Sequence, residues 1–127
     1  MVMKKVIFSQ NAPKPLGPYS QAIQAGKFLF VSGQLAINPT TGKIVTKDIE
    51  GQTRQVMDNI NAILQAADYS LKNVVQSTVY LASMKLFESF NREYAKYFED
   101  KFPARATVSA ELNAGALVEV SVVAYKE

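Results

Sequence analysis

Cysteine and histidine are both absent from this sequence. Without cysteine the chain can form no disulfide, no thiolate metal site and no thiol nucleophile. Without histidine it lacks the commonest general base, the commonest zinc ligand and the central member of a serine–histidine–aspartate triad. If the protein is an enzyme, its proton transfers must therefore run through Glu, Asp, Lys, Tyr or bound water.

Long apolar runs and long basic runs are also missing. No stretch approaches the roughly 18 apolar residues of a membrane-spanning helix, and the N-terminal segment turns polar too early to supply the apolar part of a signal peptide. The 14 basic residues outnumber the 11 acidic ones and give a net charge of +3, but the longest basic block is Lys4–Lys5. We therefore expect a cytoplasmic protein with no membrane partner, and nucleic-acid binding has little support.

What the sequence does contain is enough apolar material for one core. Its 127 residues have the size of one ordinary domain, and 48% of them are hydrophobic while 20% are charged. Such a composition can bury a core and is unlike that of a disordered chain. No internal repeat, low-complexity tract or linker interrupts it, so we expect a single domain over residues 1–127.

Periodic patterns predict three short strands, a helix, a strand, a second helix and two final strands, in that order. The expected strands cover residues 4–8, 20–25, 28–31, 74–81, 105–110 and 117–125, and the expected helices cover residues 49–67 and 86–100. A stretch with three prolines, residues 11–19, predicts an ordered surface loop. A second loop, of small residues, is expected over 113–116.

Helices interleaved with a mixed sheet predict an α+β sandwich with both helices on one face of the sheet. Within the strand expected at 74–81, alternation predicts that Val75, Val79 and Leu81 share a face. The valines of residues 118–123 put apolar groups on both faces of the last strand. The sheet face without helices therefore needs a cover, and a second subunit is the natural candidate.

Two charged residues stand out against apolar surroundings near the end of the chain. Arg105 begins an expected strand and shares a strand face with Thr107 and Ser109. It either reaches solvent from the strand end or offers its paired donors to a carboxylate ligand. Glu119 lies in the middle of an apolar run. It is either a solvent-facing residue of an amphipathic strand or a desolvated carboxylate, whose raised pKa would suit it to act as a general base.

Three further positions allow both an ordinary and a functional interpretation. Tyr19 ends the proline-rich loop and could serve packing or a site. Gly33 interrupts an apolar strand, where it indicates either a bulge or the close approach of a ligand to the backbone. Asn91 stands in the second expected helix between Phe90 and Tyr94, where an exposed neutral residue is the ordinary interpretation.

Six short segments occur in an order and spacing that is typical of one known family. They are GPYSQA at 17–22, VSGQ at 31–34, QTRQV at 52–56 followed by Asn59, FNREY at 90–94, FPARATV at 102–108 and LVEV at 117–120. Through these segments nearly the whole chain resembles the Rid family of reactive-intermediate deaminases, also described as the YjgF-type family.

The resemblance implies a fold, an assembly and an activity. The fold is the chorismate-mutase-like α+β fold of the bacillus type, with a mixed sheet and two helices packed on one face. The assembly is a homotrimer with a cleft at each subunit interface. The activity is a hydrolytic deamination that needs neither metal nor cofactor. It converts reactive 2-imino or enamine acids, such as 2-iminobutanoate and 2-iminopropanoate, to 2-keto acids and ammonia, a form of metabolite damage control.

Matched residue by residue, the resemblance also implies roles for side chains. Arg105 would bind the substrate carboxylate, and Glu119 would position or activate the attacking water. The pocket would be lined by Tyr19, Ser32, Gly33, Asn91 and Thr107, the last standing where some members carry Cys.

The chain departs from the family pattern in three places. Segment 108–113 is about one residue shorter than usual and lacks a Leu-Pro turn, which disturbs the register between Arg105 and Glu119. The first helix ends in Ala67-Asp68, where the family usually has Ala-Gly, and losing the preferred C-cap glycine should cost stability. The third departure, Val120 in place of Ile or Met, is conservative.

Two other functions remain open from the sequence. A non-catalytic sensor could use the same cleft to bind a small carboxylate, and it would be favoured if Glu119 pointed away from Arg105. An RNA-active protein is the third hypothesis, against which the absent histidine and the dispersed lysines argue.

Overall fold

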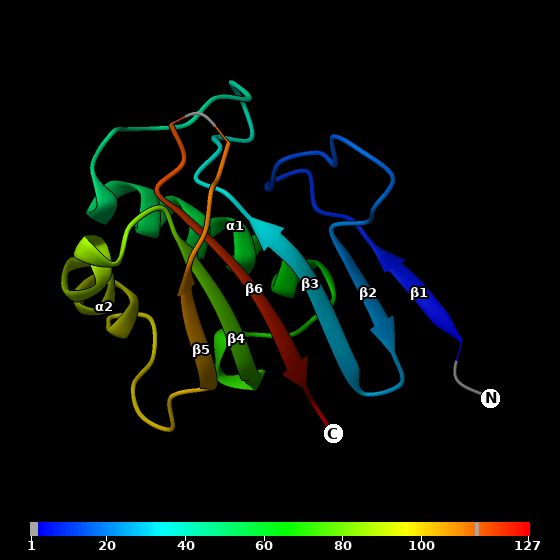
Figure 1. Cartoon of the computed structure of the whole chain (residues 1–127). Helices are drawn as coiled ribbons and strands as arrows, with labels where there is room; N and C mark the ends of the chain where they lie inside the picture. Colours follow the sequence, from blue (N-terminus) through cyan, green and yellow to red (C-terminus); the bar gives the residue numbers. More distant parts are fainter. Residues whose placement is uncertain (1–2, 114) are drawn as a thin grey trace.

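The structure is a computed structural model that describes residues 3–113 and 115–127. Six strands form one mixed sheet in the order β1-β2-β3-β6-β4-β5, and both helices lie on one side of it (Figure 1). The strands are β1 (Lys4–Ile7), β2 (Ala22–Ala25), β3 (Phe28–Gln34), β4 (Val74–Leu81), β5 (Ala104–Ser109) and β6 (Val118–Tyr125), and the helices are α1 (Ile49–Ala66) and α2 (Phe87–Ala95). The predicted order of elements and the predicted α+β class are confirmed.

Strand β6, the last in the chain, lies in the middle of the sheet. It pairs in antiparallel fashion with β3 on one side and with β4 on the other. Strands β4 and β5 are parallel, which the crossover through α2 allows, since parallel neighbours cannot be joined by a tight hairpin. The insertion of β6 thus brings the N-terminal hairpin and the C-terminal strands into one sheet.

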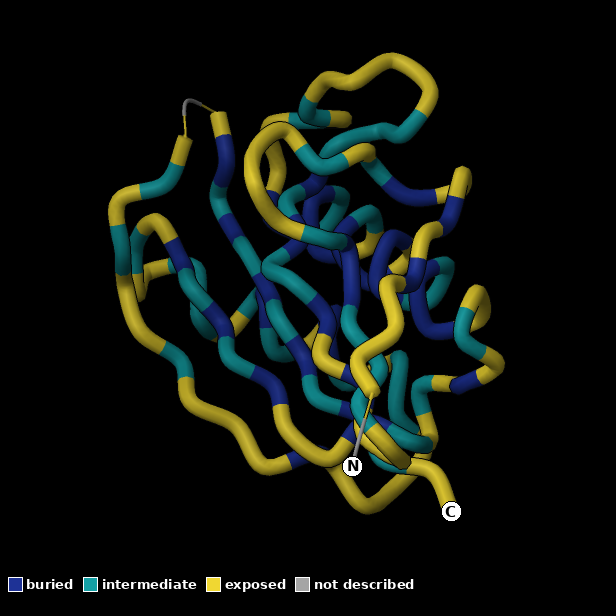
Figure 2. Tube along the Cα trace, turned by 90° about the vertical axis from the view of Figure 1, so that its right-hand side faces the viewer, coloured by how far each residue is buried: buried dark blue, intermediate teal, exposed yellow. Residues whose placement is uncertain are grey.

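The core lies between the sheet and the helices. Along β6 buried and half-buried residues alternate strictly, so that Val118, Val120 and Val122 face the helices, as the alternating colours of the central strands show (Figure 2). Helix α1 closes the core with an apolar stripe, of which Val56 and Ile60 are completely buried. One layer of helices therefore suffices to cover one face of the sheet.

The other face of the sheet carries no helix and exposes large apolar side chains. In the register of the sheet, Val6, Phe30 and Val108 all point to this side. They remain 61%, 47% and 47% exposed, respectively. Polar side chains such as Thr78 and Ser121 lie between them on the same face. Exposed apolar side chains gathered on one sheet face are typical of a surface that another polypeptide covers.

The register of β4 and the end of α2 differ from the predictions. A shift in pairing between Val74 and Gln76 turns Val74 into the core and leaves Val75 exposed, so Val75 does not share the face of Val79. Helix α2 ends at Ala95 rather than at residue 100. The N–H groups of residues 96–98 donate to carbonyls three residues earlier, which tightens the chain out of the α-helical path.

The loops follow the sequence prediction where they are described. The proline-rich stretch forms an irregular loop, and Gly26 turns the β2–β3 hairpin with a φ of 61°. In the small-residue loop expected over 113–116, Ala114 lies outside the described residues. None of the helices in the described part of the chain is both long and apolar enough to cross a membrane.

Candidate functional site

A cavity of about 540 Å³ opens where the proline-rich loop meets the end of β3 and the start of β6. Its polar lining includes Lys14, Tyr19, Ser32, Asn113 and Glu119. We call it the Glu119 pocket. It contains the predicted site residues of the N-terminal half of the chain together with the candidate base.

A buried carboxamide holds the proline-rich wall of this pocket in place. Gln21 accepts a hydrogen bond from the Ser9 N–H at 2.6 Å and donates to the Pro13 carbonyl at 2.9 Å. The Tyr19 hydroxyl accepts from the Leu16 N–H at 3.2 Å. The loop needs these side-chain partners because its prolines cannot donate backbone hydrogen bonds. Gln21 was not predicted as a site residue.

At the end of β3, the backbone of Gly33 lies close to the carboxylate of Glu119. The pairing of β3 with β6 shifts between Val31 and Gln34, so the predicted bulge is present at Gly33. The Ser32 hydroxyl donates to the Ser20 carbonyl at 2.6 Å. The Glu119 carboxylate lies directly over Gly33, where a β-carbon would overlap Oε2. Glycine at this position lets the carboxylate lie against the backbone, and a larger residue would require the Glu119 side chain to move.

The Glu119 carboxyl is partly withdrawn from water. Burial raises its pKa above the usual range of a glutamate, because removal from water disfavours the charged form. No salt bridge of the described residues involves Glu119. A carboxylate with a raised pKa in a cavity is suited to accept a proton from water.

Arg105 lies at the start of β5, against α2. Its Nη1 donates to Asn91 Oδ1 at 2.9 Å. Its guanidinium carbon lies 5.6, 5.9 and 5.2 Å from the ring centres of Phe87, Phe90 and Tyr94. The helical spacing of three and four places all four α2 side chains under the guanidinium. A smaller cavity of about 430 Å³, the Arg105 pocket, opens at this point.

The surroundings of Arg105 stabilise its charge without a carboxylate. No acidic side chain pairs with it among the described residues, and the rings supply cation–π contacts instead. The Tyr94 hydroxyl is fixed by a 2.7 Å hydrogen bond with Ser77, the residue that pairs with Arg105 in the sheet. Beside Arg105 on the strand, the Thr107 hydroxyl is buried and has no hydrogen-bond partner in the described structure. Arg105 therefore keeps donors for an incoming carboxylate.

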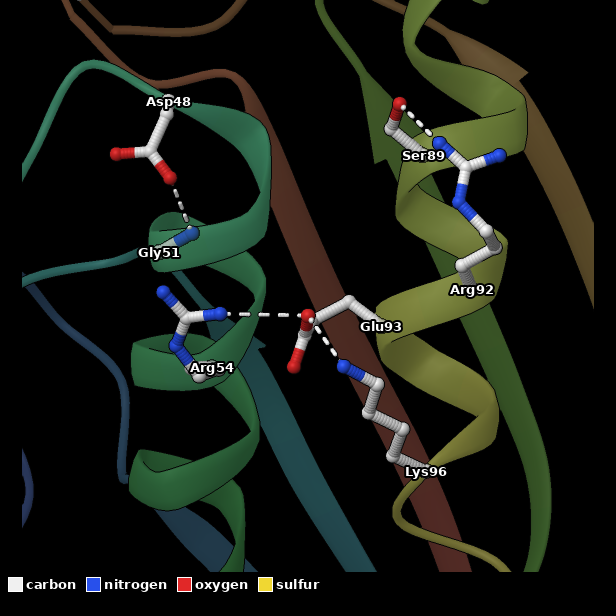
Figure 3. A network of polar contacts seen from close by, with 7 residues as sticks. All are labelled: Asp48, Gly51, Arg54, Ser89, Arg92, Glu93 and Lys96. Atoms are coloured by element: carbon white, nitrogen blue, oxygen red, sulfur yellow. Dashed lines mark hydrogen bonds and ion pairs between the residues drawn. The ribbon is translucent and has the colours of Figure 1, made fainter.

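Helix α2 is fixed to α1 by a separate polar cluster. The buried Glu93 carboxylate of α2 lies 3.3 Å from Arg54 of α1 and 3.2 Å from Lys96, the residue that directly follows α2 (Figure 3). At the start of α1, Asp48 accepts a hydrogen bond from the Gly51 N–H at 2.7 Å. These contacts lie outside both pockets, and they anchor the helix that carries Asn91.

One chain does not bring Arg105 and Glu119 together. Tyr80 of β4 pairs with Glu119 of β6 and with Val108 of β5, so these three side chains share a face. Arg105 pairs with Ser77 and lies three residues before Val108. Because side chains alternate along a strand, Arg105 points to the helix side of the sheet, whereas Glu119 points to the open side.

The predicted site residues therefore form two groups. One group lines the Glu119 pocket and consists of Tyr19, Ser32, Gly33 and Glu119. The other group surrounds the Arg105 guanidinium or lies beside it on the strand, and consists of Asn91, Arg105 and Thr107. No cluster of three or more Asp or Glu side chains that could hold a metal ion occurs within residues 3–113 and 115–127.

Sequence reasoning missed residues that support the two groups. Phe87 and Phe90 were not predicted as site residues, yet both rings lie close to the guanidinium. Asn59 of α1 donates to the carbonyls of Leu35 and Ile37, which follow β3. Two signals were available for Asn59: its place in one of the family-typical segments, and its position among the buried residues of an amphipathic helix, since a buried amide must have partners.

A family model described as Endoribonuclease L-PSP matches residues 9–126. Among curated relatives, a RutC family protein of Pyrococcus horikoshii is 56% identical over 126 residues, which cover 98% of this chain and 100% of that protein. The Reactive Intermediate Deaminase A, chloroplastic, of Arabidopsis thaliana is 43% identical over 97% of this chain and 66% of that protein. The 2-iminobutanoate/2-iminopropanoate deaminase of Mus musculus is 38% identical over 98% of this chain and 93% of that protein.

Solved structures share the fold over its full length. A Rid family protein of unknown function from Yersinia pestis matches with a TM-score of 0.94 and 45% identity, over 98% of this chain and 100% of that one. TdcF of E. coli with bound serine matches with a TM-score of 0.91 and 31% identity, over 97% of this chain and 99% of that one. The predicted chorismate-mutase-like α+β fold is confirmed by these matches.

Proposed function

This chain belongs to the Endoribonuclease L-PSP family, to which the Rid deaminases also belong, and we propose that it hydrolyses 2-imino acids to 2-keto acids and ammonia. The observation that carries the proposal is how the Arg105 guanidinium is held in the structure. Its guanidinium is held by aromatic rings and an amide rather than by a carboxylate. It is therefore ready to bind the carboxylate that every 2-imino acid carries. The names of two relatives, both deaminases, support the same reaction.

The proposed hydrolysis needs only the protonated imine, a water molecule and the side chains already described. The carbon of a protonated imine is already electrophilic, so a positioned water can add to it while Glu119 accepts one water proton. The product of this addition is a carbinolamine. Glu119 then passes this proton to the nitrogen, the C–N bond breaks and ammonia leaves, and the hydroxyl proton returns to the Glu119 carboxylate as the hydroxyl oxygen becomes the keto carbonyl. A positioned general base typically contributes about 10²–10⁴-fold to such a step.

The complete site is proposed to lie between subunits. Within one chain Arg105 and Glu119 point to opposite sides of the sheet. A homotrimer would place the Arg105 pocket of one protomer against the Glu119 pocket of its neighbour, with the exposed apolar sheet face as part of the contact. The open-face side chains Val6 and Phe30 support this arrangement, because their exposure in a single chain leaves apolar area to be covered.

A carboxylate sensor is the second candidate function. It is favoured by the same separation of Arg105 and Glu119, since a single chain could bind a carboxylate without presenting a base to it. The solved structure of TdcF with bound serine supports small carboxylates as ligands in the family. The endoribonuclease activity named in the family description is not part of the proposal, because this chain has no histidine and its lysines are dispersed along the sequence.

An imine-trapping assay tests the proposed reaction. A threonine dehydratase generates 2-iminobutanoate in the presence of semicarbazide, which traps the free imine. Addition of this protein should lower the amount of trapped product, because hydrolysis removes the imine before the trap captures it. The Arg105→Ala variant should leave the trapped product at its level without enzyme.

The outcomes separate the two functions. A folded Arg105→Ala variant with unchanged activity would contradict the role of Arg105. If the wild-type protein leaves trapping unchanged but binds 2-ketobutanoate, with binding lost in Arg105→Ala, the sensor function replaces the deaminase.

A further inference from the structure

Gln52 is a completely buried amide on α1. Its Nε2 donates to the carbonyl of Thr46 at 2.9 Å and to the carbonyl of Gly115 at 2.8 Å. Its Oε1 accepts from the N–H of Leu117 at 2.8 Å. Both donors and one acceptor lone pair are therefore used, and all three partners are backbone atoms.

Two of these partners belong to the segment that leads into β6. Leu117 is held from both sides, because its N–H donates to Gln52 and its carbonyl accepts from the Ala82 N–H at 2.9 Å. Glu119 follows two residues later on the same strand. Asn113, before the segment, lines the same pocket as Glu119. Gln52 thus bonds to the segment that joins two residues of the pocket lining, Asn113 and Glu119, although neither Gln52 nor its partners line the cavity.

We propose that Gln52 is a positioning residue that fixes the start of β6 and thereby holds the Glu119 carboxylate over Gly33. The space there is tight, since a β-carbon on residue 33 would overlap the carboxylate. A small displacement of β6 would therefore move the carboxylate away from the backbone and toward water. The consequence for catalysis rests on the proposed function, but the placement of Glu119 does not.

A merely structural role for Gln52 makes a different prediction. Loss of a buried hydrogen-bonded amide lowers stability wherever it occurs. It would leave the titration of Glu119 unchanged, since Gln52 itself carries no charge. The titratable side chains that line the cavity are Lys14, Tyr19 and Glu119, and Tyr80 of β4 lies opposite Glu119 on the same face of the sheet. None of them is removed by a change at residue 52.

The test compares Gln52→Met with Tyr69→Phe. Methionine has a similar length but keeps none of the three hydrogen bonds. Tyr69→Phe is the matched control, because it removes one buried hydrogen bond, from the hydroxyl to the Lys27 carbonyl at 2.8 Å, at a place that lines neither pocket. If Gln52→Met does not fold, Gln52→Asn replaces it, since the shorter amide adds no charge that would shift the titration of Glu119 but falls about one methylene short of the three backbone partners.

The first readout is an NMR titration of isotope-labelled glutamate, with the Glu119 signal identified by its absence in Glu119→Gln. We expect the pKa of Glu119 to fall toward its usual range in Gln52→Met and to stay raised in Tyr69→Phe. The second readout is imine hydrolysis, in which kcat should fall by about tenfold or more in Gln52→Met while KM changes little, because misplacement affects the reacting group more than carboxylate binding.

The two readouts keep the two proposals apart. An unchanged Glu119 titration in a folded, destabilised Gln52 variant overturns the positioning role. A shifted titration with unchanged kcat upholds the positioning role and removes Glu119 from the proposed mechanism. If the wild-type protein hydrolyses no imine at all, the titration alone still decides the role of Gln52.

Discussion

The proposed chemistry needs Glu119 as an ionised base, but burial of this carboxylate opposes folding. Burial raises its pKa, so the folded chain holds the carboxyl proton more tightly than the unfolded chain does. The stabilising effect of that proton is fully present below the usual pKa of a glutamate, and it is lost as the pH rises through the raised value. At neutral pH the ionised carboxylate therefore opposes folding, in the place where a base would be needed.

The Glu119→Gln variant should separate these two effects. It should raise the melting temperature at neutral pH, because the amide is not charged, and it should have little effect at a pH below the usual range of glutamate. Imine hydrolysis should be lost at both. Thermal melts at the two pH values measure the first effect, and equal melting temperatures for variant and wild type at neutral pH would contradict it.

Candidate functional residues were predictable from the sequence where a charged side chain stands among apolar neighbours. Arg105 and Glu119 stand out in apolar sequence, and the structure places each at a cavity. The supports of these residues were not predictable, because Phe90 and Gln52 occupy buried positions of amphipathic helices. Their partners come from segments far away in the chain, and no local pattern specifies such contacts.

At the scale of secondary-structure elements, helix α1 ends in a backbone conformation that is unfavourable for a residue with a β-carbon. The N–H of Tyr69 donates to the Leu64 carbonyl and that of Asp68 to the Gln65 carbonyl, which is the Schellman pattern. Asp68 adopts a φ of 65°, in the left-handed region. The sequence predicted that an aspartate stands here in place of the preferred C-cap glycine. The left-handed backbone of Asp68 is the conformation for which glycine is preferred.

Replacing Asp68 by glycine should stabilise the protein. A residue with a β-carbon loses roughly 1–2 kcal/mol in the left-handed region, and the greater freedom of glycine in the unfolded chain offsets part of that, so we expect a gain of up to about 1 kcal/mol. The midpoint of urea unfolding should rise while its slope stays the same. Asp68→Ala is the control, because it removes the same carboxylate but keeps the β-carbon, and an equal gain in that variant would rule out the backbone explanation.

Elements were predictable from the sequence to the extent that their patterns are local. The stripe of α1 and the full length of β4 follow from periodicity alone. The shift in β4 that exposes Val75 could not be read in this way, because a bulge is a property of two paired strands. The early end of α2 was hidden as well, since Phe98 still packs on Tyr94, with ring centres 5.0 Å apart, beyond the end of the helix.

At the scale of the whole molecule, the sheet separates what the proposed reaction must bring together. The register of β6 turns Glu119 to the side without helices, and the register of β5 turns Arg105 toward α2. The resemblance of the sequence to a family implied clefts between subunits, and the order of the strands supplies a physical reason for them. In the proposed arrangement, each protomer would contribute half of a site from each of two surfaces.

Mixing two defective variants tests whether sites form between protomers. Arg105→Ala and Glu119→Gln should each be inactive alone. When the two are co-expressed in equal amounts, sites that combine the intact Arg105 of one chain with the intact Glu119 of another should restore about a quarter of the wild-type activity if subunits assemble at random in a cyclic oligomer. If each chain held a complete site, the mixture would stay inactive. Wild-type protein co-expressed with the double variant is the control, since it should keep about a quarter of full activity with shared sites and about half with sites inside single chains.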